Sequence, residues 1–338
     1  MSTHWLKKLV AGLIAGVLIA LALFTFSAAK ASTTFYYSVT DLGSGEAVDI
    51  NDLGQVVGVS VTDGFLWKDG TNTKIGDLWG NYPAAIRINN KGQVTSTKIT
   101  YRSNITAFFL ENGVKTNLGT LNGAPTKAAG INNRGQVVGS AETDLGKQTW
   151  LWQKGTMMDV IPVQVKDFAP SAINDKTQIV GTVFRTTKFR TTSYAGLWEN
   201  GNITPLAFPG ALSSYAYDIN LAGQVVGTAQ VRRHPNLHAV LWENGKAVDL
   251  GGFGGDSYAY GINAVGKVVG RAETETGGRR AFLWNKGKMF DLNNLIAPDS
   301  GWFLSSANAI NNRGQIVGTG GYHNQQRAFL LTPIRITQ

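Results

Sequence analysis

The sequence predicts an all-β fold, a seven-bladed β-propeller with four-stranded blades whose ring is closed by the N-terminal strand. Three observations predict it. A motif of the form I-N-x-x-G-Q-V-V-G recurs seven times at intervals of 38 to 48 residues, each copy holds four short strand-like segments, and the last copy lacks a fourth segment that stands instead at the start of the chain. Four strands in about 40–45 residues is the period of a propeller blade.

Each copy is centred on an Ile-Asn pair that predicts a tight turn between the first two strands, a and b. An Asn side chain can close such a turn on its own backbone, and the Gly that follows takes the positive φ. Segments such as Val137–Gly139 then predict strand b, Phe282–Trp284 strand c and Val248–Gly251 strand d. The repeat asparagines are Asn51, Asn89, Asn132, Asn174, Asn220, Asn263 and Asn311.

Small and aromatic residues recur at fixed places in the repeat and predict how the blades pack. Alanine stands three residues before the repeat isoleucine in six copies, with Pro170 in the remaining one. We expect these small side chains where the innermost strands crowd near the axis. The aromatic residue of strand c, for example Trp242, is expected to lie in the core between neighbouring blades.

The two ends of the chain distinguish a closed ring from an open solenoid. The last copy ends at Leu331–Ile334 without a D-L-G strand, whereas Tyr37–Gly43 is a D-L-G strand with no repeat before it. Adding the first strand to the last copy completes seven blades and removes exposed sheet edges, whereas a solenoid would need caps. We therefore expect Tyr37–Gly43 to pair with Phe329–Ile334.

Composition excludes several classes of protein. The chain has 338 residues, 41 glycines, 9 prolines and 16% charged residues, which suits many short strands joined by turns. Its 43% apolar content argues against disorder. Because there is no cysteine, disulfides, thiolate metal sites and a cysteine nucleophile are all excluded.

The N-terminal segment has the features of an export signal. Lys7 and Lys8 precede an apolar run over Leu9–Phe26, and Ala29-Lys30-Ala31 offers a cleavage site. We therefore predict a signal peptide over residues 1–31, a propeller over 35–334 and a C-terminal tail over 335–338. The product would be extracellular or periplasmic, and its formal charge would fall from +9 to +6 with the loss of three lysines. The alternative is a membrane anchor over residues 9–26, since 18 apolar residues are close to the length of a spanning helix.

The repeat resembles the HAF repeat of bacterial extracellular proteins, which is named for His-Ala-Phe at the start of strand c. His238-Ala239-Val240 is the nearest match, and Arg280-Ala281-Phe282 and Arg327-Ala328-Phe329 keep Ala-Phe without the histidine. The resemblance covers essentially all of the mature chain and implies export and a repeat architecture, but no defined reaction. Because histidine is scarce at this position, we interpret it as a packing residue and not as a shared ligand.

No catalytic or metal-binding constellation stands out. His234 and His238 lie four residues apart in a predicted loop and strand, which indicates no metal site, and we expect no cofactor.

Acids such as Asp249 and Glu243 recur at the same position from copy to copy, which indicates a structural role because an active site needs a unique group. The acids outside this register include Asp63, Glu142, Asp144, Asp167, Asp256, Glu273, Glu275 and Asp299. A pair of them across the ring, or an acidic pair in the central funnel, would indicate an enzyme.

A meander places the a–b and c–d turns on one face of the ring and the b–c and d–a loops on the other. The second face has the longer and more variable loops, so we expect function there. Its predicted binding residues are the cations of the b–c segments, accompanied by d–a aromatics such as Phe168, Tyr258 and Trp302. These cations are Arg185, Lys188, Arg190, Arg232, Arg233, Arg271, Arg279, Arg280 and Arg327.

These observations favour an exported, non-enzymatic, monomeric binding or scaffold propeller. Its expected partner is an anionic polysaccharide or an acidic protein surface. The charge is moderate and the chain carries an export signal, so nucleic acid is not expected, and a membrane is expected only if the leader stays uncleaved. Two alternatives remain: a propeller glycan hydrolase or lyase that uses an off-register carboxylate pair, and a purely architectural protein without a ligand.

Overall fold

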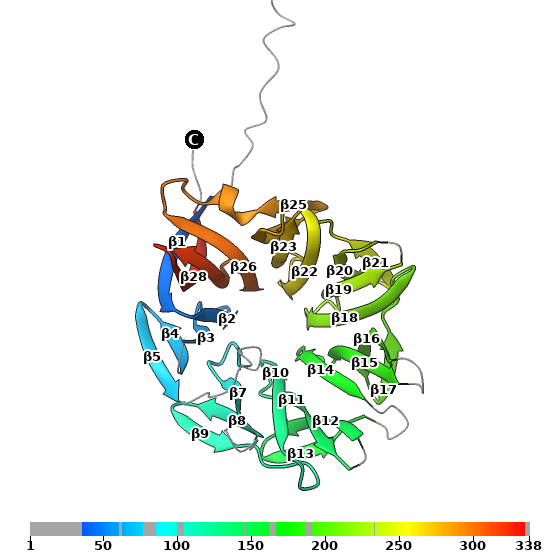
Figure 1. Ribbon diagram of the computed structural model, residues 1–338. Helices are drawn as coiled ribbons and strands as arrows, with labels where there is room; N and C mark the ends of the chain where they lie inside the picture. The colour runs from blue at the N-terminus through cyan, green and yellow to red at the C-terminus, as the bar shows by residue number, and fades with distance from the viewer. Residues whose placement is uncertain are drawn as a thin grey trace, which may run out of the picture. The chain divides into compact units, whose positions relative to one another are not determined.

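Seven antiparallel sheets of four strands each surround a central axis, as the sequence predicts (Figure 1). The structure is a computed structural model. It describes residues 36–60, 63–76, 86–99, 105–144, 146–161, 167–186, 191–232 and 234–334. The predicted leader and the predicted tail lie outside these residues, and the blades occupy Tyr36–Ile334. Within the described part, no helix is long and apolar enough to cross a membrane.

Blades 1 to 6 use consecutive strands, which run from the axis outward in the order a to d. Blades 1 to 3 consist of β2 (Glu46–Ile50), β3 (Val56–Val59), β4 (Gly64–Lys68) and β5 (Thr71–Gly76); β6 (Arg87–Ile88), β7 (Val94–Ile99), β8 (Ile105–Glu111) and β9 (Val114–Asn117); and β10 (Thr126–Ile131), β11 (Val137–Thr143), β12 (Gly146–Gln153) and β13 (Thr156–Asp159). Blades 4 to 6 consist of β14 (Phe168–Ile173), β15 (Ile179–Thr186), β16 (Thr191–Glu199) and β17 (Asn202–Pro205); β18 (Ala211–Ile219), β19 (Val225–Val231), β20 (Leu237–Glu243) and β21 (Lys246–Asp249); and β22 (Gly254–Ile262), β23 (Val268–Thr274), β24 (Arg279–Asn285) and β25 (Lys288–Asp291).

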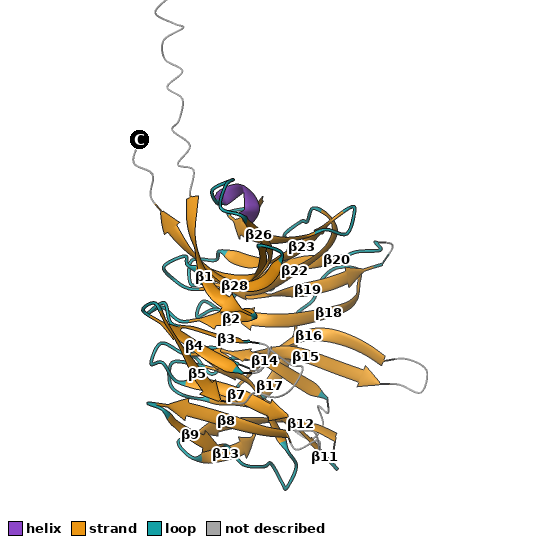
Figure 2. Ribbon diagram, turned by 60° about the vertical axis from the view of Figure 1, so that its left-hand side comes forward, coloured by secondary structure: helices purple, strands orange, loops and turns teal. Residues whose placement is uncertain are grey.

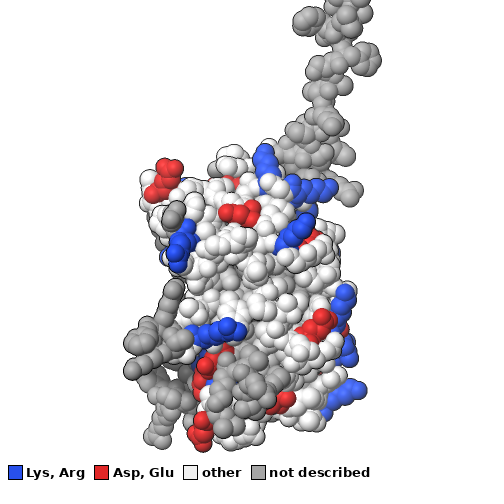
Figure 3. Space-filling model, turned by 90° about the vertical axis from the view of Figure 1, so that its right-hand side faces the viewer, with Lys and Arg blue, Asp and Glu red and all other residues white. Residues whose placement is uncertain are grey.

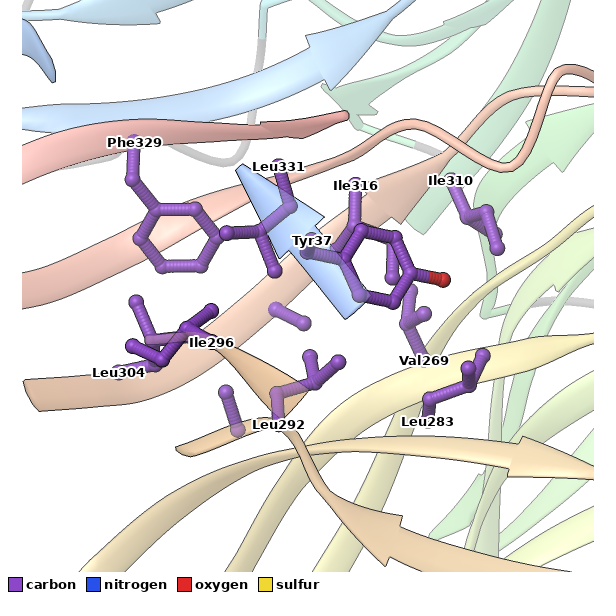
Figure 4. Packing of buried hydrophobic residues seen from close by; sticks show 12 residues of the cluster. Tyr37, Val269, Leu283, Leu292, Ile296, Leu304, Ile310, Ile316, Phe329 and Leu331 are labelled. Atoms are coloured by element: carbon purple, nitrogen blue, oxygen red, sulfur yellow. The ribbon is translucent and has the colours of Figure 1, made fainter. Parts of the chain in front are cut away.

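Blade 7 joins the two ends of the propeller and confirms the predicted closure. It consists of β26 (Trp302–Ile310), β27 (Ile316–Tyr322), β28 (Gln325–Ile334) and, as its outer strand, β1 (Tyr36–Ser44). The register runs from Tyr36 opposite Ile334 to Ser44 opposite Arg327. Tyr37 is 4% exposed and packs among Ile316, Leu331 and Val269, so β1 contributes to the core between blades 6 and 7 (Figure 4).

The meander separates the two faces of the ring as expected (Figure 2). The a–b and c–d turns are short, and c–d turns such as Asn112-Gly113 place two successive residues at positive φ, which is the geometry of a tight hairpin. The b–c and d–a connections lie on the opposite face. A short 3₁₀ helix, η2 (Leu292–Leu295), is part of the connection between blades 6 and 7.

The glycine of V-V-G is required because strand a bulges against strand b. In blade 1 the register shifts between Ala47 and Asp49, and Ala47 lies opposite Gly58. A Cβ on Gly58 would collide with the carbonyl oxygen of Glu46, and the equivalent glycines of blades 3 to 7 would make the same collision. Blade 2, whose described strand a is only Arg87–Ile88, has Ser96 at this position.

The same bulge determines which way the repeat alanines point. Ala47 and its described equivalents are buried on the innermost strands as predicted, and they pack in the layers between blades, where Ala47 contacts the cluster of Phe65 and Leu330. They do not line the channel itself. Because the bulge adds a residue, the positions after the alanine, such as Asp49, face the channel instead.

The repeat asparagines form a closed ring of hydrogen bonds around the channel. Each buried Asn donates through Nδ2 to the backbone oxygen of the Asn in the next blade, at 2.8 to 3.2 Å, and Asn311 donates back to Asn51. In blade 3 the Oδ1 of Asn132 accepts from the amides of Arg134 and Gln136, which closes its own a–b turn. One side chain therefore shapes the turn and joins neighbouring blades.

The tryptophans of strand c lie between blades, as predicted. Trp242 of blade 5 is 3% exposed and packs against Val180 and Ala195 of blade 4. Its Nε1 donates to the carbonyl oxygen of Ala207 at 3.1 Å. Trp150 is fully buried in the corresponding layer between blades 2 and 3.

Candidate functional site

A pocket of about 570 Å³ opens on the b–c/d–a face, over the inner edge of blade 7. Blade 6 contributes Tyr260, Arg271 and Arg279 to its wall, and blade 1 contributes Glu46. The residues from blade 7 are Ser305, Ser306, Asn308, Thr319, Gly320, Gly321, Asn324, Gln325 and Gln326. We call this cavity the blade-7 pocket.

Gly321, near the end of β27, leaves space for this pocket, whereas a Cβ on its neighbour Gly320 would collide with the Phe303 carbonyl oxygen, 2.7 Å away inside blade 7. A Cβ on Gly321 would meet no atom within 4 Å, and the residue does not need a positive φ. A Cβ on Gly320 would lie 3.3 Å from the Trp302 ring. A larger residue at position 321 would therefore fill the hollow without disturbing the packing of blade 7.

Two arginines of blade 6 present guanidinium groups to the pocket. Arg271 lies over the ring of Tyr258, with 4.7 Å between its Cζ and the ring centroid. Glu273 is 3.8 Å from Arg271 and 3.7 Å from Arg279, which is longer than a strong charge-assisted hydrogen bond. The buried Nε of Arg271 has no hydrogen-bond partner among the described residues. The pocket thus has cationic donors that its own acids do not saturate.

Tyr260 and Asn308 connect the pocket to the axial channel, because both residues line both cavities. Tyr260 also stands in an aromatic column, 6.0 Å from Tyr258 and 5.8 Å from Tyr217 between ring centroids. The channel has a volume of about 350 Å³ and is walled by the strand-a ends and a–b turns of all the blades. The two cavities therefore border each other at these two residues.

Among the described residues, four carboxylates and Arg87 line this channel: Asp52 and Asp175 lie in a–b turns, and the pair Asp49 and Asp218 lies on strand a. Asp49 accepts hydrogen bonds from the amides of Ile50 and, in the next blade, Ile88. Asp218 bonds in the same way to the amides of Ile219 and Ile262. Both carboxylates thus join neighbouring blades, a structural use that occupies all four carboxylate oxygens with backbone donors.

Burial raises the pKa of Asp218 to about 6, against the opposing effect of its two amide hydrogen bonds. Because the folded pKa lies above the usual value of 3.8, the folded state binds the proton more tightly. This group's contribution to the free energy of unfolding should therefore fall, by at most about 3 kcal/mol, as the pH rises from about 4 to about 6. The measurement is urea unfolding of wild type and Asp218→Asn across that range. A stability difference between the two that does not change with pH would contradict the prediction.

The position that names the HAF repeat carries a polar bond to strand d. His238 Nδ1 lies 2.8 Å from Asp249 Oδ2, Arg280 Nε lies 3.4 Å from Asp291, and Arg327 binds Asp41 through two nitrogens. Gln148 donates to Asp159 in the same way. The residue thus pairs with the Asp of D-L-G and is more than a packing residue, while the register acids are structural as expected.

The remaining predicted cations are spread over other blades. Arg185 is exposed in blade 4, with its Cζ 5.2 Å from the Tyr194 ring centroid, and Arg232 is exposed just after β19 in blade 5. Lys188, Arg190 and Arg233 lie outside the described residues. Lys, Arg, Asp and Glu are interspersed along the side of the ring seen in Figure 3. Of the predicted cations that the structure describes, Arg271 and Arg279 come together at the blade-7 pocket.

Histidines do not build a metal site in the described ranges, where no group of three or more His, Cys, Asp or Glu side chains could hold an ion. The rings of His234 and His238 meet edge to face at 5.5 Å between centroids.

The predicted aromatic residues of the d–a loops have different surroundings. Phe168 is buried in the core, Tyr258 lies under Arg271, and Trp302 stacks on Tyr322.

Sequence reasoning missed most of the pocket's polar residues. Glu46, Tyr260 and Asn308 belong to strand a, whereas the sequence predicts binding residues in the b–c segments and d–a loops. The signal that would have found the site is the run Gly320-Gly321, because no other copy has two glycines after V-G-T. The channel acids Asp49 and Asp218 are also visible as Asp-Ile-Asn, where four other copies have Gly or Ala before Ile-Asn and the second copy has Arg87.

Comparisons with known proteins support the fold. No protein-family model matches the chain, and no curated protein matches its sequence, so the HAF relation remains a resemblance. The chain is similar to the β-propeller domain of the Trilobed protease from Pyrococcus furiosus, with 10% identity, a TM-score of 0.58, and coverage of 90% of this chain and 96% of that one. That domain is described as having an open velcro topology, whereas β1 closes the ring here.

Two further solved structures share the architecture. One is streptogramin B lyase, with 11% identity, a TM-score of 0.55, and coverage of 89% of this chain and 98% of that one. The other is the acylaminoacyl peptidase of Pyrococcus horikoshii, with 12% identity, a TM-score of 0.51, and coverage of 91% of this chain and 47% of that one. At these identities the similarity establishes a β-propeller and nothing about activity.

Proposed function

We propose that this protein is an exported, non-enzymatic binding propeller that recognises an acidic saccharide in the blade-7 pocket. The observation that carries the proposal is the pair Arg271 and Arg279, which both line the pocket and come no closer than 3.7 Å to Glu273. A carboxylate on the ligand would accept hydrogen bonds from Arg271 and Arg279 with little loss of existing bonds. The export part of the proposal rests on the signal peptide predicted over residues 1–31.

The rest of the pocket suits the hydroxyl groups of a sugar. Its wall combines one aromatic residue, Tyr260, with short hydroxyl and amide side chains, such as Ser306, Asn308 and Gln326. Amides and hydroxyls both donate and accept hydrogen bonds, as a polyhydroxylated ring requires. A mostly polar, open pocket with a few aromatic contacts favours a saccharide over an apolar ligand.

Calorimetric titration of the full chain with galacturonate and with neutral galactose tests the proposal. The uronate should bind at least tenfold more tightly than the neutral sugar, and added salt should weaken it. Arg271→Gln should reduce uronate affinity by roughly 10- to 100-fold, as expected for the loss of a charge-assisted bond. Gly321→Phe should block the pocket, since the space beside its Cα is open.

Arg185→Gln is the control, because Arg185 is likewise an arginine over a tyrosine ring but is exposed and lies in blade 4. It should leave uronate affinity unchanged. Melting temperatures of all three variants would separate loss of the ligand from loss of the fold. The proposal fails if galacturonate does not bind, or if folded Arg271→Gln and Gly321→Phe both bind it as wild type does.

A second candidate function is the glycan hydrolase or lyase, which the acidic pair Asp49 and Asp218 in the channel favours. A pKa of about 6 would allow Asp218 to donate a proton near neutrality. Against this, both acids already hold backbone amides of two blades. Release of reducing ends from an acidic polysaccharide, lost in Asp218→Asn, would favour the enzyme over the binding protein.

A further inference from the structure

The b–c turn of blade 7 departs from the turn chemistry used elsewhere in the molecule. Tyr322 pairs with Gln325, so His323 and Asn324 alone make the turn, with φ of 48° and 60°. The tight c–d turns of blades 1 to 6 have a similar φ at their first residue but always a glycine second, as in Asp69-Gly70, Asn112-Gly113, Lys154-Gly155, Asn200-Gly201, Asn244-Gly245 and Lys286-Gly287. The blade-7 turn thus departs at its second residue alone, where Asn324, a residue type that tolerates positive φ, stands in place of glycine and adds a polar side chain.

An aromatic platform stands directly behind this turn. The rings of Trp302 and Tyr322 stack at 4.9 Å between centroids and 16° between planes. His323 is exposed, and its ring lies 4.1 Å from that of Tyr322. Trp302 and Tyr322 are both half-buried, so part of the stack remains accessible to solvent.

The platform adjoins the blade-7 pocket. Asn324 lines the pocket from the turn, and Gly320 lines it from β27. The Trp302 ring lies 3.3 Å from the place of a Cβ on Gly320, so it borders a residue of the pocket wall. A ligand held by Arg271 and Arg279 that extends past Asn324 would meet His323 and the aromatic stack next.

We propose that Trp302, Tyr322 and His323 form a second sugar subsite, and that the ligand is therefore an acidic oligosaccharide of at least two units. This inference rests on the proposed function, because the first unit occupies the blade-7 pocket. Sugar rings present C–H faces that pack on aromatic rings, and the imidazole and Asn324 amide supply hydrogen bonds to hydroxyls. The subsite then accounts for Asn324 at a turn position that holds glycine in the c–d turns of blades 1 to 6.

Titration of the full chain with galacturonate and with its linear α-1,4 tetramer tests the subsite. Wild type should bind the tetramer at least tenfold more tightly than the monomer. His323→Asn keeps a residue that tolerates positive φ but removes the imidazole, and it should reduce tetramer affinity at least threefold. Tyr322→Leu should remove most of the tetramer's advantage. Neither variant should change monomer affinity by more than twofold.

Lys286→Asn is the matched control, because Lys286 takes the same turn position, with φ of 48°, on the opposite face. It should leave the affinity for both ligands unchanged. The proposed subsite is contradicted if the tetramer binds no better than the monomer, or if His323→Asn and Tyr322→Leu lower the affinity for both ligands equally. Either result would leave the proposed blade-7 pocket unaffected. If neither ligand binds to wild type, the pocket and the subsite both fail.

Discussion

Replacing Asn132 with alanine is expected to lower the free energy of unfolding by about 3–5 kcal/mol. The buried side chain makes four hydrogen bonds: Nδ2 donates to the Asn174 oxygen and to Gln136 Oε1, and Oδ1 accepts from the amides of Arg134 and Gln136. Alanine would leave the amides of Arg134 and Gln136 without their bonds, whereas the Asn174 oxygen and Gln136 Oε1 each keep a bond from Thr177. Each amide so left costs about 1–3 kcal/mol before relaxation, and the lost bond between the blades adds to this. Urea unfolding followed by tryptophan fluorescence measures the loss.

The adjacent residue provides the control for this prediction. Asn133 belongs to a second ring, in which the amide after the repeat Asn donates to the side chain at the same position of the next blade. That ring is interrupted where Leu221 and Ala264 stand, so the fold already tolerates its breaks. Asn133→Ala should therefore cost no more than about 1 kcal/mol. Equal losses in the two variants would show that the buried ring has no special role.

Trp242→Ala is expected to destabilise the protein by about 3–5 kcal/mol, as for other large-to-small changes in a packed core. The indole fills the layer between blades 4 and 5 and donates to the Ala207 carbonyl, so the variant loses both the packing and the partner of that oxygen. Thermal melting and urea unfolding of the variant measure the change. An unchanged melting temperature would contradict the assignment of Trp242 to the core.

Val248→Ala offers a comparison within the same blade. Val248 lies in the outer strand β21 and is 41% exposed, so its truncation removes little buried surface. A change of no more than about 0.5 kcal/mol is expected. The contrast between Trp242 and Val248 would locate the stability of a blade in the layers between blades and not at its outer edge.

The fold could be predicted in detail because each repeat encodes its own turns. Asn132 and Gly135 specify an a–b turn through hydrogen bonds between residues two to four apart. Seven copies of the same local signal then determine the number of blades. Ring closure was also predictable, since Tyr37 belongs to a strand type that is missing only from the last copy.

The candidate site was only partly predictable. Arg271 and Arg279 were found because charge marks the b–c segments of the later blades. The same reasoning included Arg280 and Arg327, whose charges pair with Asp291 and Asp41 within a blade. The strand register decides which side of a strand faces a neighbouring strand and which side faces a cavity. The sequence pattern does not determine this register at the ends of strands b and c.

The sequence by itself determined that this chain is a seven-bladed ring closed by its first strand, because turn chemistry and strand periodicity act over a few residues and repeat seven times. Only the tertiary structure decided where a ligand has room. The blade-7 pocket joins Glu46, Tyr260 and Gln326, which are far apart in the chain and meet only when the ring closes. The hollow between them depends on the absence of a side chain at Gly321. The run Gly320-Gly321 marks one wall of this space, but no local pattern identifies the other two blades that enclose it.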